Sequence, residues 1–138
     1  MHRPPAVPPF DDSHLDRITA QSESGNVDYR PDGRAVQSPR GALYAMQVMP
    51  ATARDPGFGL EPADPNNADD MNRLGRDYRA AMHRRYGGDL AKMWAAYNWG
   101  PGHLDAAIRR HGVNWMRALP AETQAYLERN FKHLRSAA

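Results

Sequence analysis

The 138-residue sequence contains no cysteine, which excludes a disulfide framework, a thiolate metal site and a cysteine nucleophile. It also lacks any apolar run near the roughly eighteen residues that a membrane-spanning helix requires, so we expect no membrane insertion. The first ten residues carry four prolines and no apolar segment of the kind found in secretory signals. We therefore expect no signal peptide in this chain.

An excess of charge of one sign is absent as well, since 18 basic residues face 16 acidic ones and the net charge is +2. Most of the basic residues are arginines, which suit phosphate recognition, but they are scattered and interleaved with acids. This pattern is typical of a solvated surface, and we expect no nucleic-acid partner. The histidines form no HExxH pair and residues 64–70 lack the glycine and final glutamate of a calcium loop, so no metal and no cofactor are expected.

The length allows one ordinary domain. Residues 1–10 contain two proline pairs, which fix an extended backbone and predict a proline-rich arm or linker. The remaining residues, 11–138, are expected to form a single folded domain that carries the function.

Helical periodicity dominates this domain and predicts a mainly α, compact helical fold. Apolar residues recur at helical spacing, with Gly or Pro at the boundaries, in segments 13–24, 50–53, 71–86, 90–99, 104–111 and 120–134. Ser13 is expected to cap the first of these helices. Only residues 27–37, which contain an Asp-Gly turn, allow a short two-stranded excursion.

Glu23 is the first candidate for chemistry, because it lies near the end of a predicted helix and opposes the negative end of the helix dipole. That position, or an apolar pocket, raises the pKa of a carboxyl group toward the range that a general acid needs near neutral pH. An ordinary surface glutamate fits the periodicity equally well.

Two further segments combine amides with apolar or aromatic groups. Gln47 lies between two methionines, and Tyr97, Asn98 and Trp99 precede a Gly-Pro-Gly turn. Amides beside aromatic rings suit sugar binding, because N-acetyl groups need hydrogen-bond partners and sugar faces stack on rings. Taken singly, each residue could equally belong to the core or to a helix end.

Four motifs in order cover nearly the whole domain. They are Glu-Ser at 23–24, SPRGA at 38–42 followed by MQVMPATA at 46–53, AYNWGPG at 96–102, and LPAETQAY at 119–126. In these motifs the sequence resembles the lytic transglycosylase family with the goose-lysozyme-like fold. The resemblance implies a compact lysozyme-like helical domain that acts on peptidoglycan glycan strands.

The resemblance also implies a reaction and a set of site residues. The family cleaves the β-1,4 bond between N-acetylmuramic acid and N-acetylglucosamine and forms a 1,6-anhydro sugar, with Glu23 expected as the single general acid and base. The residues expected to bind substrate are Ser38, Gln47, Met49, Tyr97, Asn98, Trp99 and Glu122.

Two positions depart from the family pattern, because Tyr44 replaces a usual glycine and Trp99 replaces a usual small residue. Residues 27–37 and 53–59 are similar to phage-encoded members. We therefore expect a phage protein that acts on the cell wall or in the bacterial periplasm, either within a larger virion protein or as an endolysin released through a holin. A monomer is expected.

Two alternatives remain open from the residues. Asp28 or Asp32 follows Glu23 closely and could activate water, which would make the protein a hydrolysing muramidase. The domain could also be a helical module without catalysis, which either binds peptidoglycan or is itself an arginine-rich virion protein that touches DNA.

Overall fold

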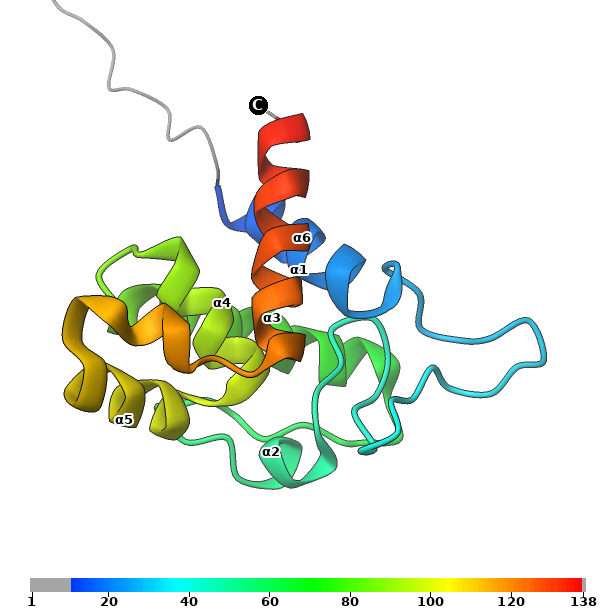
Figure 1. Ribbon diagram of the computed structural model, residues 1–138. Coiled ribbons are helices and arrows are strands. Elements are labelled where there is room, and N and C mark those ends of the chain that lie inside the picture. Colours follow the sequence, from blue (N-terminus) through cyan, green and yellow to red (C-terminus); the bar gives the residue numbers. More distant parts are fainter. Residues whose placement is uncertain (1–10, 138) are drawn as a thin grey trace, which may run out of the picture.

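The computed structural model describes residues 11–137 and shows a helical domain (Figure 1). The proline-rich arm predicted at residues 1–10 lies outside the described residues. The α-helices are α1 (Asp12–Ser24), α2 (Pro50–Arg54), α3 (Ala68–Arg85), α4 (Leu90–Trp99), α5 (Pro101–His111) and α6 (Ala121–Ala137), and a 3-10 helix, η1 (Gly112–Ala118), lies between α5 and α6. The mainly helical fold class is confirmed, whereas η1 was not expected from the sequence.

The beginning of α1 differs from the prediction. Asp11, not Ser13, is the N-cap, and its carboxylate accepts a hydrogen bond of 2.9 Å from the backbone N–H of His14. The sequence offers several adjacent residues that can cap a helix, so periodicity alone could not decide among them. The end of α1 is as predicted, because Gly25 has a left-handed backbone with φ of 72°.

The predicted two-stranded excursion is present in reduced form. Tyr29 pairs with Ala35 in an isolated antiparallel bridge, and further isolated bridges join Leu43 to Gln37 and to Val48. In Figure 1 this light blue and cyan segment extends away from the helices. It has too few ladder hydrogen bonds to form a sheet.

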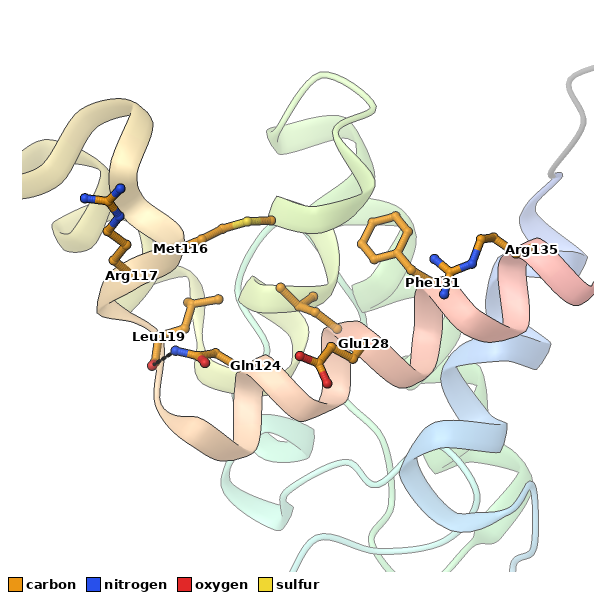
Figure 2. Close-up of a pocket in the computed structure, with 8 residues that line it drawn as sticks. Met116, Arg117, Leu119, Gln124, Glu128, Phe131 and Arg135 are labelled. Atoms are coloured by element: carbon orange, nitrogen blue, oxygen red, sulfur yellow. Dashed lines mark hydrogen bonds between the residues drawn. The ribbon is translucent and has the colours of Figure 1, made fainter.

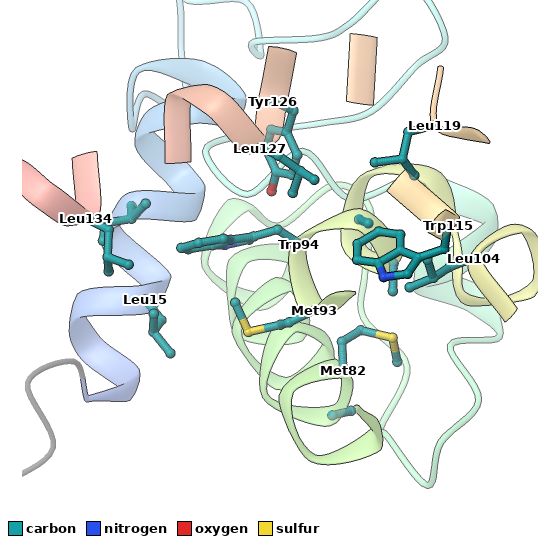
Figure 3. Close-up of a cluster of buried hydrophobic side chains, with 14 residues drawn as sticks. Leu15, Met82, Met93, Trp94, Leu104, Trp115, Leu119, Tyr126, Leu127 and Leu134 are labelled. Atoms are coloured by element: carbon teal, nitrogen blue, oxygen red, sulfur yellow. The ribbon is translucent and has the colours of Figure 1, made fainter. Parts of the chain in front are cut away.

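Helix α4 passes through the main hydrophobic core. Its residues 93–96 are completely buried, surrounded by apolar side chains from α1, α3, α5, η1 and α6 (Figure 3). The indole N–H of Trp94 donates to the hydroxyl of Thr19 at 2.9 Å, and that hydroxyl donates to the Leu15 carbonyl at 2.7 Å. These bonds satisfy the buried polar atoms and hold α1 against α4.

A second core cluster packs the irregular residues 44–48 against the first half of α3. Gly75 permits this contact, because a Cβ atom there would lie 2.5 Å from the Cβ of Met46. The close approach fixes the loop that carries the second motif over α3.

A buried arginine ties α1 to α3. Arg79 is completely buried, and its guanidinium donates to Asp16 and to Asp12 at 2.6 Å each. Burial raises the pKa of Asp16, and the bond from Arg79 opposes this effect. Because α1 is held at its start by this network, its last turn, which contains Glu23, has a defined position.

Candidate active site

Glu23 is partly buried in the last turn of α1, the helix that packs against α6. Desolvation raises the pKa of its carboxyl group from 4.5 to about 7, and the nearby charge of Glu122 acts in the same direction. The Tyr126 hydroxyl and the Arg129 charge lower the pKa, but burial outweighs them. Near neutral pH the group is therefore protonated about half of the time, which suits a residue that both gives and takes a proton.

Tyr97 lies close to Glu23, whose charge helps to raise the pKa of the Tyr97 phenol well above its ordinary value, although burial is the larger cause. The Tyr97 hydroxyl donates to the Met46 carbonyl at 2.6 Å. This bond joins α4 to the loop of the second motif. In this structure the Tyr97 proton is thus committed to the backbone and not to the Glu23 carboxyl.

A cavity of about 220 Å³ lies between that loop and the end of α4. Its lining includes five of the residues that the sequence singled out as substrate-binding: Gln47, Met49, Tyr97, Asn98 and Trp99. Segments about fifty residues apart in the sequence therefore meet at one concave site.

Each of the two side-chain amides in this cavity makes one hydrogen bond to the protein. The Gln47 Nε2 donates to the Tyr44 carbonyl at 2.8 Å, and the Asn98 Oδ1 accepts from the Thr123 hydroxyl at 2.8 Å. Within the described residues this leaves the oxygen of Gln47 and the amide nitrogen of Asn98 for a ligand. One acceptor and one donor are what an N-acetyl group requires.

Aromatic rings surround the same cavity. The Trp99 ring stacks on the His103 imidazole, with centroids 5.2 Å apart and planes inclined by 16°. Tyr78, which also lines the cavity, meets the Tyr97 ring edge to face at 6.1 Å. These contacts fix the orientation of the rings before any ligand binds.

Glu23, Ser38 and Glu122 are not among the residues that line the cavity. The Ser38 hydroxyl accepts a bond of 3.0 Å from the backbone N–H of Ala42, which stabilises the turn before the loop. Glu122 is exposed in the first turn of α6, and its charge acts on Glu23. Roles for both residues at the rim of the site stay predictions.

The backbone at Tyr44 has a φ of 63°, in the left-handed region that favours glycine. This conformation accounts for the glycine that the family usually has at this position. The side chain is buried, its hydroxyl donates to the Pro65 carbonyl at 2.9 Å, and its ring meets Tyr29 edge to face at 5.9 Å. These contacts offset the backbone strain of a bulky residue in this conformation.

The two carboxylates considered as water-activating groups both take part in local structure. The Asp28 carboxylate accepts from the backbone N–H of Ala45 at 2.9 Å and from the Asn72 amide at 2.7 Å. Asp32 is exposed and pairs with Arg34 at 3.1 Å. Asp28 therefore braces the loop of the second motif, and Asp32 stabilises its own turn.

Sequence reasoning missed the contribution of α6 to the surroundings of Glu23. Tyr126 belongs to the fourth motif but was not expected to act at the site, and Arg129 was not singled out. Helical spacing places Glu122, Tyr126 and Arg129 on neighbouring turns of α6. No local pattern in the sequence indicates that these turns pack on the end of α1.

A larger groove of about 570 Å³ lies between η1 and α6 (Figure 2). Its lining is mainly apolar, and its carboxylic acid, Glu128, is exposed. None of the predicted site residues lines it, so the smaller cavity beside Tyr97 is the better candidate for chemistry.

Between residues 11 and 137, no helix combines the length and apolar character needed to cross a membrane. In the same part of the chain, no three His, Asp or Glu side chains come together in a way that could hold a metal ion.

Comparison with known proteins agrees with the geometry of the site. A family model of the transglycosylase SLT domain matches residues 18–115. The soluble lytic murein transglycosylase of Salmonella typhimurium is 32% identical over an alignment of 111 positions, and the match covers 67% of this chain and 16% of that protein. This chain thus spans less than a fifth of the length of that relative. The matched residues include Glu23 and the whole cavity, and we conclude that the chain belongs to the transglycosylase SLT domain family.

Proposed function

We propose that this protein is a peptidoglycan lytic transglycosylase. It cleaves the β-1,4 bond between N-acetylmuramic acid and N-acetylglucosamine and leaves a 1,6-anhydro-N-acetylmuramic acid end. The observation that carries this proposal is the buried Glu23 carboxyl, whose pKa of about 7 suits a single group that acts as acid and then as base. Membership of the SLT family and a cavity lined by amides and aromatic rings support it.

In the first step, protonated Glu23 donates its proton to the glycosidic oxygen, and the bond from that oxygen to C1 breaks. Most glycosidases then need a second carboxylate as nucleophile or base. In this protein the substrate's own 2-acetamido carbonyl stabilises C1, as in substrate-assisted enzymes.

In the second step, the Glu23 carboxylate removes the proton from the C6 hydroxyl of the muramic acid, and that oxygen bonds to C1. The product is the anhydro sugar, and Glu23 regains the proton that it gave. Water is neither consumed nor required.

The residues around the cavity bind and orient the sugars. Gln47 and Asn98 hydrogen-bond N-acetyl or hydroxyl groups, Trp99 provides a stacking surface, and Met49 lines the site. Tyr97 fixes the loop that carries Gln47, through its bond to the Met46 carbonyl. Ser38 and Glu122 contribute at the rim.

A hydrolysing muramidase is the second candidate, but it needs a carboxylate that is free to activate water. Asp28 already accepts two hydrogen bonds from the protein, and exposed Asp32 pairs with Arg34, so neither is favoured. A module without catalysis is less favoured too, because it has no need for a buried carboxyl at the site. An arginine-rich virion protein that touches DNA is less favoured because the net charge is only +2.

The test is the digestion of purified peptidoglycan with the full chain, followed by mass spectrometry of the products. We expect anhydro ends from the native protein, none from Glu23→Gln, and unchanged activity from Glu128→Gln, which removes an exposed acid outside the site. Reducing muramic acid ends would favour the muramidase, and full activity in Glu23→Gln would overturn both enzymatic proposals.

We also propose that the protein is phage-encoded and acts on the periplasmic or cell-wall peptidoglycan of the host, as a virion component or as a lysis enzyme released through a holin. The similarity of residues 27–37 and 53–59 to phage-encoded members supports this. Antibody detection in purified virions and in host lysates distinguishes the two roles, and absence from both would refute the proposal.

A further inference from the structure

Helix α6 contains an unusual pair of buried polar side chains, Tyr126 and Asn130, one helical turn apart. Both are 0% exposed. Within the described part of the chain, neither the Tyr126 hydroxyl nor either amide atom of Asn130 makes a hydrogen bond of standard geometry. An unpaired buried amide is strongly unfavourable, so its presence beside a candidate active site calls for a functional explanation.

Tyr126 interacts with both Glu23 and Asn130. The approach of Glu23 raises the pKa of the Tyr126 phenol, as expected when the phenol donates to a carboxylate, although burial is the larger cause. The approach of Asn130 lowers that pKa, as expected when an amide N–H donates to the phenol oxygen. An ionised carboxylate can only accept hydrogen bonds, so a bond between Tyr126 and ionised Glu23 must use the Tyr126 proton, and the phenol oxygen is then left to accept from the Asn130 amide.

The other groups near Glu23 do not provide a hydroxyl proton. Arg129 and Glu122, from α6, act on it through their charges, and Tyr97, from α4, donates its proton to the backbone. Among the groups that act on Glu23, Tyr126 is the one with a hydroxyl proton not donated elsewhere.

The packing of α6 places Tyr126 and Asn130 close to the cavity. Thr123, one turn before Tyr126, donates to Asn98 in the cavity at 2.8 Å. The face of α6 that contains Thr123, Tyr126 and Asn130 is buried throughout. Catalytic hydrogen bonds are commonly long or poorly aligned in free enzymes and shorten when substrate binds.

We propose that Asn130 is a positioning residue for Glu23: its amide holds the Tyr126 oxygen, so that the Tyr126 hydroxyl donates to the Glu23 carboxylate when that group is ionised. This role rests on the proposed function, and it favours the ionised form that takes the proton from the sugar. Burial alone would raise the pKa of Glu23 further and keep the carboxyl group protonated. The Asn130–Tyr126 pair lowers this pKa and so opposes the effect of burial.

The experiment measures the pKa of Glu23 in the full chain by carboxyl carbon NMR, with Glu23→Gln to assign the signal. We expect Asn130→Leu to raise this pKa by about half a unit or more, and Tyr126→Phe to raise it at least as much. The double variant should match Tyr126→Phe, since Asn130 acts through Tyr126. In the pH profile of kcat/KM on peptidoglycan, the alkaline limb should move upward to the same extent, with kcat reduced and KM little changed.

Two controls separate this role from simple structural support. Asn130→Leu replaces an unpaired buried amide by an apolar group of similar size, so Tm should be unchanged or higher. A merely structural Asn130 predicts a lower Tm with an unshifted Glu23 pKa. Ser22→Ala removes another buried, unpaired hydroxyl, on α1, and should leave the pKa of Glu23 unchanged. Asn130→Ser, which keeps a donor, should recover part of the shift and serves if the leucine variant does not fold.

An unshifted Glu23 pKa in the Asn130 variants, or additive shifts in the double variant, would overturn the proposal. The NMR titration needs no activity, so the two proposals fail separately. An inactive native protein with this coupling intact refutes the proposed function. An active native protein without the coupling refutes the role of Asn130 alone.

Discussion

Glu23 should make the folded protein less stable as the pH rises, and Glu23→Gln should remove this penalty. A carboxyl group whose pKa is raised in the folded state binds its proton more tightly there than in the unfolded chain. Its contribution to stability is therefore fully present below the unfolded value of 4.5 and is lost as the pH rises through about 7. Glutamine cannot ionise, so the variant keeps its stability over this range.

The expected magnitude follows from the two pKa values. The pKa rises from 4.5 to about 7 on folding. Each pH unit corresponds to about 1.4 kcal/mol, so the native protein loses about 3 kcal/mol relative to Glu23→Gln between pH 4 and pH 8. In a domain of this size, that difference corresponds to about 10 °C in Tm.

Urea unfolding of both proteins at a series of pH values measures this difference directly. The gap in the free energy of unfolding should be constant below pH 4, widen between pH 4 and pH 7, and level off above pH 8. Glu128→Gln should run parallel to the native protein at every pH. Parallel curves for Glu23→Gln and the native protein would refute the raised pKa, and with it the observation on which the catalytic proposal depends.

Three further predictions concern other parts of the structure. Gly75→Ala should lower the free energy of unfolding by about 1–3 kcal/mol, because its methyl group would overlap the side chain of Met46. Gly102→Ala has open space and should be neutral or stabilising, and chemical denaturation compares the two variants. Asp28→Ala should lower the free energy of unfolding by about 2–3 kcal/mol, because it leaves the buried Asn72 amide and the Ala45 backbone N–H unpaired, whereas Asp32→Ala should lower it little. If neither carboxylate activates water, mass spectrometry should still detect anhydro products from both variants. Trp99→Ala should raise KM for glycan strands several-fold with a small effect on Tm, and an unchanged KM would show that the ring only covers the end of its helix.

The helices of this protein could be predicted because their signals are local. Apolar residues repeat along α3, Asp89 caps α4 through its bond to the Lys92 N–H, and Gly25 ends α1. The start of α1 was placed wrongly because Asp11 and Ser13 are equally good caps. The 3-10 helix η1 was missed because its seven residues have no distinctive period.

The residue types of the site could also be predicted, but their surroundings could not. The motifs indicated Glu23, Gln47 and Asn98. That Tyr97 donates to a backbone carbonyl, and that Asp28 braces a loop through Asn72, depends on contacts between segments far apart in the chain. No local pattern encodes such contacts.

The sequence by itself determined a helical domain with one suitably placed acid, because caps, periodicity and motif spacing act over a few residues. Only the tertiary structure decided how that acid behaves. Helix α6 packs against α1, and the burial of Glu23 in the last turn of α1 raises its pKa to about 7. The same packing places Tyr126 and Arg129 near it, and both lower its pKa, since the free energy of a charge depends on everything that surrounds it in space.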